Sequence, residues 1–88
     1  MESLYQYQIL VEFDDETASQ DQRQTYSKFQ DKYGASGIGH EKYGTSTLSF
    51  ISDEDLTRKD IALLLSEIPV LGFDKKNADK EYMILFKK

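Results

Sequence analysis

Two runs of carboxylates, each placed directly after an apolar strand pattern, are the residues of this chain best suited to chemistry. The first run is Asp14-Asp15-Glu16 and the second is Asp53-Glu54-Asp55. Carboxylate oxygens are the ligands that a hard cation such as Mg²⁺ takes in proteins. The spacing therefore suggests a magnesium site formed by Asp14, Asp15 and Asp53, and it suggests no other cofactor.

The same carboxylates have a simpler interpretation, because each run also precedes a helical pattern. Acidic side chains at a helix start accept hydrogen bonds from free N–H groups and oppose the positive end of the helix dipole. Helix capping explains both runs without any ligand, and we favour it over metal binding. The choice between capping and metal binding stays open at the level of sequence.

A shared location for the two runs would allow two further functions. We expect the first and third strands to be parallel neighbours, so that both runs leave one edge of the sheet and Glu16, Glu54 and Asp55 complete an acidic edge. Clustered carboxylates serve metal-dependent phosphodiester chemistry, which would make the protein a nuclease centred on Asp14. Alternatively, the acidic edge could imitate phosphates and inhibit a nucleic-acid-binding protein.

The remaining candidates for catalysis are weak. His40 is the single histidine of the chain, and no partner that would make it a general base lies at short spacing. The segment 37–39 reads Gly-Ile-Gly, but it lacks the lysine and the third glycine that phosphate-binding loops require. We therefore expect no catalytic residues, and a non-enzymatic protein.

Length and charge narrow the function further. The 88 residues form a single domain, 1–88, because so short a chain cannot build two cores. Its net charge of −5 disfavours direct binding to nucleic acids or anionic membranes, which depends on clustered cations. The chain has no cysteine, no apolar run of membrane length and no signal-peptide pattern, so we expect a cytoplasmic protein.

The hydrophobic pattern predicts four strands and two helices. The first strand covers residues 5–13, and a helix follows that Thr17 and Gln20 begin as a capping box and Gly34 ends. The second helix is predicted to begin at Ser52 or Asp53 and to end at Pro69. The other predicted strands are residues 36–41, 46–51 and 81–87, and residues 70–79 are expected to form an apolar connection and a polar turn.

This order of elements, βαββαβ, predicts an α+β fold of the ferredoxin-like kind. A right-handed crossover between strands that flank a helix leads to a four-stranded antiparallel sheet in the order 4-1-3-2, with both helices on one face.

The other face of this sheet is the most promising functional surface. Tyr5, Tyr7 and Ile9 share one side of the first strand and are expected to face the helices. The open side carries Leu4 and Leu10, and the last predicted strand would add Met83 and Leu85. Apolar side chains among polar ones on an exposed face mark interfaces. We therefore expect a small regulatory or interaction module, which forms a homo-oligomer such as a homodimer or binds a protein partner through its sheet face.

A few residues also resemble a known group of small proteins. Phe13-Asp14 ends the first strand, Arg23 lies on the helix, and Tyr33-Gly34 closes it. In these positions the chain resembles the ferredoxin-like CRISPR adaptation nucleases and the GhoS-type antitoxin ribonucleases. The resemblance covers residues 7–34 and implies a metal-ligand role for Asp14 alone. Residues 37–41 do not match the Ser-Val-Phe-Glu-like run of the adaptation nucleases.

Overall fold

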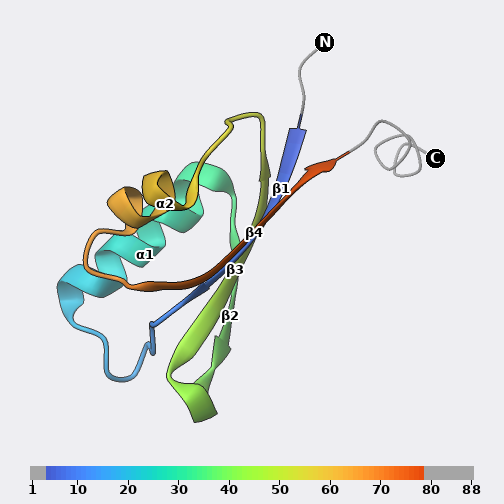
Figure 1. Cartoon of the computed structure of the whole chain (residues 1–88). Helices are drawn as coiled ribbons and strands as arrows, with labels where there is room; N and C mark the ends of the chain where they lie inside the picture. The colour runs from blue at the N-terminus through green and yellow to red at the C-terminus, as the bar shows by residue number, and fades with distance from the viewer. Residues whose placement is uncertain (1–3, 79–88) are drawn as a thin grey trace.

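A computed structural model of the chain describes residues 4–78 and shows an α+β fold (Figure 1). Neither α-helix of this range is long and apolar enough to cross a membrane. The elements are β1 (Leu4–Val11), α1 (Gln20–Tyr33), β2 (Ser36–His40), the 3₁₀ turn η1 (Glu41–Tyr43), β3 (Thr45–Ser52), α2 (Arg58–Leu65) and β4 (Val70–Ala78).

The four strands form one open sheet in which every neighbouring pair is antiparallel. The order is β2-β3-β1-β4 when it is read from the β2 edge, and the same sheet reads 4-1-3-2 from the β4 edge. Both helices pack on the same side of the sheet (Figure 1). No helix of residues 4–78 lies over the other side, which we call the open face.

The expected parallel pairing of the first and third strands is wrong. β1 and β3 are antiparallel, with Tyr5 opposite Ser52 and Val11 opposite Ser46. The reason is the tight connection between β2 and β3, where η1 and Gly44 (φ 65°) reverse the chain. β3 then inserts between β2 and β1 and runs opposite to both. The carboxyl end of β1 therefore lies beside the start of β3, and not beside its end.

The position of the last strand also differs from the prediction. β4 begins at Val70 and pairs with β1 along its whole length, where an apolar connection and a polar turn were expected. Its inward residue Phe73 packs against the core, and the Lys75 ammonium lies 4.7 Å from the centre of the Tyr5 ring. An edge strand tolerates charged residues such as Asp74 and Lys76 on its outer face, so the polar composition of residues 74–78 does not indicate a strand. The predicted strand 81–87 lies outside the described residues.

Both helices begin later than predicted. α1 starts after Ser19, which forms a capping box with Gln22, because the N–H groups of Thr17 and Ala18 already bind the Asp14 carbonyl in a turn. α2 starts after Thr57, whose capping-box partner is Asp60. Thr17, Ser52 and Asp53 are therefore not helix caps. The predicted end of α1 is confirmed, because Gly34 adopts the left-handed conformation (φ 63°).

The core lies between the sheet and the helices and confirms the predicted inward face of β1. Tyr7, Ile9 and Val11 are completely buried, and Tyr5 packs at the edge of the same cluster. The Tyr7 ring stacks on Phe50 with centroids 4.7 Å apart. Because side chains alternate along a strand, burial of these residues turns Gln6, Gln8 and Leu10 toward the open face.

Candidate functional site

The open face of the sheet carries a row of side chains that crosses all four strands. Ile38 of β2 lies opposite Thr47 of β3, Thr47 lies opposite Leu10 of β1, and Leu10 lies opposite Gly72 of β4. Directly paired residues project to the same side of a sheet, so these four positions share the open face. Gly72 brings its backbone against Leu10, because a Cβ atom placed there would lie 3.3 Å from the Leu10 Cβ.

The apolar members of this face are partly exposed. The side chain of Leu10 is 36% exposed, Ile38 60% and Ile51 43%. Isolated exposed aliphatic residues are common on protein surfaces, but these three belong to three neighbouring strands and share one face of the sheet. We refer to Leu10, Ile38 and Ile51 as the aliphatic patch.

The second property of this face is the absence of charged side chains from most of it. Asp, Glu, Lys and Arg make up 31% of the chain, yet none of them projects from the open face within β1, β2 or β3 as the structure describes them. β4 adds one charge of each sign, Asp74 and Lys76. The outward residues of the three strands are Leu4, Gln6, Gln8, Leu10, Ser36, Ile38, His40, Thr45, Thr47, Ser49 and Ile51.

His40 belongs to this face and has a structural role there. Its Nε2 atom lies 2.8 Å from the Thr47 hydroxyl, so the two side chains form a hydrogen bond across β2 and β3. The contact orients the imidazole along the sheet beside Ile38. Within residues 4–78, the hydrogen-bond partner of this ring is a hydroxyl group and not a carboxylate.

The predicted interface residues are only partly placed by the structure. Leu4 and Leu10 lie on the open side of β1, with Leu4 half-buried, while Met83 and Leu85 lie outside the described residues. Ile38 was not among the predicted interface residues, and it extends the patch to the β2 edge of the sheet. The alternation of β2 could have identified Ile38, because it stands between two glycines.

The first acidic run lies at the end of β1, in the loop that leads to α1. The Asp14 carboxylate accepts a hydrogen bond of 3.0 Å from the Glu16 N–H, and the Asp14 carbonyl accepts two more from Thr17 and Ala18. Asp14 therefore holds a tight turn. Asp15 and Glu16 are exposed beside it.

A hollow of about 420 Å³ opens next to this turn, between α1 and β2. It exists because Gly37 and Gly39 present no side chain toward the helix. Tyr26 forms its wall, with its ring stacked on Phe13 at a centroid distance of 4.0 Å. The Ser46 hydroxyl at its base donates a hydrogen bond of 2.9 Å to the Phe13 carbonyl. The acidic rim consists of Asp14, Asp15, Glu16 and Glu41, with Arg23 as the cation among the lining residues.

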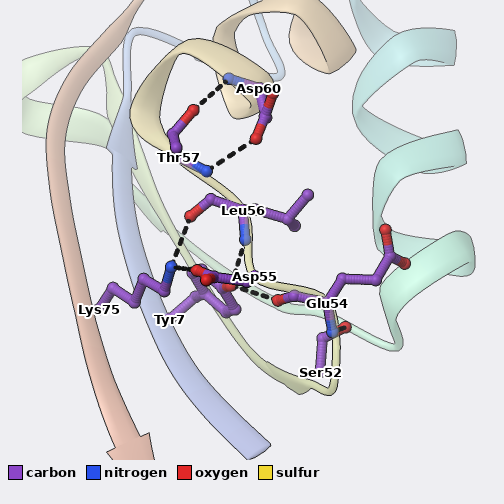
Figure 2. Close-up of polar contacts among 8 residues, drawn as sticks. All are labelled: Tyr7, Ser52, Glu54, Asp55, Leu56, Thr57, Asp60 and Lys75. Atoms are coloured by element: carbon purple, nitrogen blue, oxygen red, sulfur yellow. Dashed lines mark hydrogen bonds and ion pairs between the residues drawn. The ribbon is translucent and has the colours of Figure 1, made fainter.

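The second acidic run stabilises the loop between β3 and α2, as Figure 2 shows. The buried Tyr7 hydroxyl donates to the Glu54 carbonyl and accepts from the Leu56 N–H at 2.8 Å. Lys75 forms an ion pair with Asp55 and also donates to the Leu56 carbonyl at 3.1 Å. These contacts tie the loop to β1 and β4. The Asp55 carboxylate and the Glu54 backbone carbonyl therefore hold this loop in place, and neither residue caps α2.

The two acidic runs do not form one edge. Because β1 and β3 are antiparallel, Asp14, Asp15 and Glu16 lie at one end of the sheet, and Asp53, Glu54 and Asp55 lie at the other. The proposed magnesium set of Asp14, Asp15 and Asp53 is therefore not brought together. Within residues 4–78, no three His, Asp or Glu side chains are grouped in a way that could hold a metal ion.

Three tyrosines have altered acidity because of their surroundings. Burial raises the pKa of Tyr7, of Tyr26 and of Tyr33 above the usual value of 10.0, since the ionised phenolate loses its hydration. The negative charge of Glu54 adds to the raised pKa of Tyr7 and Tyr33. The neighbouring Ser46 hydroxyl partly opposes the effect on the pKa of Tyr26. None of the three is shifted toward neutrality, as a catalytic acid or base would require.

Comparison of the chain with protein-family models, with curated proteins and with solved structures found no match.

Proposed function

We propose that this protein is a small non-enzymatic module that associates with a second copy of itself through the open face of its sheet. The observation that carries this proposal is the composition of that face: the aliphatic patch surrounded by uncharged polar side chains. Depletion of charge at the centre distinguishes an interface from the rest of a protein surface.

The few charged side chains of the open face are compatible with a second copy of this chain as the partner. Asp74 and Lys76 lie next to each other in register on β4, opposite Gln8 and Gln6. A face with one charge of each sign can contact an identical face without net repulsion. A strongly basic or acidic partner would meet no surface of opposite net charge on it. A twofold contact between identical faces is the commonest form of association among soluble proteins.

We further propose the ferredoxin-like assignment for the fold, on the support of the element order and the open antiparallel sheet with both helices on one side. The fold assignment implies no particular activity.

The other functions suggested by the sequence receive less support. The acidic phosphate mimic required both acidic runs at one edge, and the antiparallel pairing of β1 and β3 separates them. The nuclease centred on Asp14 required neighbouring carboxylates, but the Asp14 side chain accepts a hydrogen bond from its own turn. The resemblance to the adaptation nucleases therefore contributes no residue to this proposal.

The substitution Leu10→Glu tests the proposed face contact. In the dimer it would bury an unpaired carboxylate, at a cost of several kcal/mol. Since about 1.4 kcal/mol corresponds to a tenfold change in affinity, the dissociation constant of the face contact should rise at least about 100-fold. Light scattering coupled to size separation, over a dilution series, measures the change. Circular dichroism should show an unchanged fold, because Leu10 meets water in the monomer.

Leu63→Glu is the matched control. Leu63 is an exposed leucine as well, at 72%, but it lies on α2, on the helix side of the sheet. This variant should keep the assembly of the unmodified protein. A protein that is monomeric at every concentration would refute the proposal, and so would equal sizes for Leu10→Glu and the unmodified chain.

A further inference from the structure

The two edges of the sheet differ in a way that the face contact does not explain. The β4 edge carries Asp74, Lys75 and Lys76, and its register with β1 shifts between Leu10 and Val11. Charged side chains and irregular register are the devices by which proteins prevent an edge strand from pairing with another chain. The β4 edge is thus protected.

The β2 edge has none of these devices. β2 consists of Ser-Gly-Ile-Gly-His, without a charged acidic or basic side chain and without proline, and its register with β3 is regular. Residues 36–39 are exposed, and Ile38 is 60% exposed. Among the described residues β2 pairs only with β3, so one side of its backbone keeps free N–H and C=O groups. Such an edge is a template for strand addition.

The sequence of β2 indicates which strand would fit. It is nearly symmetric about Ile38, since glycine stands on either side and a small or polar residue stands at each end. If two copies pair antiparallel about Ile38, each Gly37 meets a Gly39 and each Ser36 meets a His40. Two Ile38 side chains then lie opposite each other on the open face, an apolar cross-strand pair, and no like charges of Asp, Glu, Lys or Arg are opposed.

We propose that the β2 strands of two copies pair in this antiparallel register, around a twofold axis at Ile38. The two sheets then become one, and their open faces lie on the same side. This inference goes beyond the proposed face contact and does not depend on it, because an edge and a face can be occupied at the same time. The contact involves strands of 5 residues, so we expect it to be the weaker of the two.

Cysteine cross-linking tests the register, because the chain contains no cysteine of its own. All variants carry Leu10→Glu, which removes the face contact. Ile38→Cys should form a disulfide-linked dimer under mild oxidation at high protein concentration, since opposite residues have Cβ atoms about 4.5–5.5 Å apart. Ser36→Cys and His40→Cys should link to each other when mixed, and each should link far less alone. Leu63→Cys on α2 reports the rate of random collision.

Hydrogen exchange of the amides in residues 36–40, in the Leu10→Glu protein, provides a second measurement without cysteines. Protection that is present at high concentration and lost on dilution supports the edge contact. The proposal is overturned if Ile38→Cys links no faster than Leu63→Cys, or if Ser36→Cys links as well alone as in the mixture. These outcomes are independent of the face contact, whose failure would appear as an unchanged size of Leu10→Glu.

Discussion

At the scale of single residues, the Tyr7 hydroxyl is a buried polar group whose two hydrogen bonds both go to the backbone of one loop. It is completely buried and bridges the Glu54 carbonyl and the Leu56 N–H. In Tyr7→Phe the carbonyl and the N–H both lose their partner, while the ring keeps its packing. An unsatisfied buried polar group costs about 1–3 kcal/mol, so we expect the free energy of unfolding to fall by roughly that amount. Urea denaturation measures it.

Tyr33→Phe is the control for this prediction. The Tyr33 hydroxyl makes one long contact of 3.5 Å with the exposed Glu54 carboxylate. Its removal leaves that carboxylate in water, and the free energy of unfolding should change by less than about 0.5 kcal/mol. If the free energy of unfolding falls equally in the two variants, the two hydrogen bonds of the Tyr7 hydroxyl do not contribute the expected stability.

The buried tyrosines also predict a pH dependence. Burial raises the pKa of Tyr7, Tyr26 and Tyr33 in the folded protein, whereas the unfolded chain ionises near the ordinary value of 10.0. The neutral form is therefore favoured by folding. The stabilisation is fully present below about pH 10, where both states are protonated, and is lost as the pH rises through the folded pKa values.

Ultraviolet absorbance of tyrosinate, recorded during an alkaline titration, measures this effect. A group of tyrosines should ionise above the range of the denatured chain, together with a fall in the free energy of unfolding. If every tyrosine of the folded protein titrates as in the denatured chain, the burial of these three hydroxyls is not as described.

At the scale of elements, the two inward glycines of β2 determine how closely α1 approaches the sheet. A Cβ atom at Gly37 would lie 2.5 Å from the Tyr26 hydroxyl and 2.7 Å from the Gln30 amide. Gly37→Ala must displace both side chains, and Tyr26 is held by its stack on Phe13. Overpacking of this kind costs about 1–3 kcal/mol.

Gly39→Ala is the matched control on the same face of the same strand. Its nearest neighbour would be the Ser46 hydroxyl oxygen at 3.9 Å, which is ordinary van der Waals contact. We expect Gly37→Ala to lower the midpoint of thermal unfolding by several degrees and Gly39→Ala to leave it nearly unchanged. The reverse order would mean that α1 does not pack over Gly37.

At the scale of the whole molecule, self-association links stability to concentration. A ligand that binds only the folded state stabilises it by mass action, and a second copy of the chain is such a ligand. The midpoint of thermal unfolding should therefore rise with protein concentration. Leu10→Glu should remove most of this dependence, and Leu63→Glu should keep it. Scanning calorimetry over a wide concentration range is the measurement, and a midpoint independent of concentration would contradict self-association.

The sequence by itself determined the local properties of the molecule. Alternation in β1 identified its inward and outward faces, and Gly34 identified the end of α1, because side-chain period and left-handed backbone depend on neighbouring residues only. Leu10 could be placed on the open face for the same reason. The α+β class followed from the order of such elements.

Only the tertiary structure decided how distant elements meet. The direction of β3 depends on the hairpin at Gly44, and this direction separates the two acidic runs that appear equivalent in the sequence. β4 becomes a strand by pairing with β1, since its own Asp, Lys and Asn residues favour a turn. Likewise Ile38, Leu10 and Ile51 share one face only because long-range pairing aligns β2, β3 and β1, and local sequence carries no information about that register.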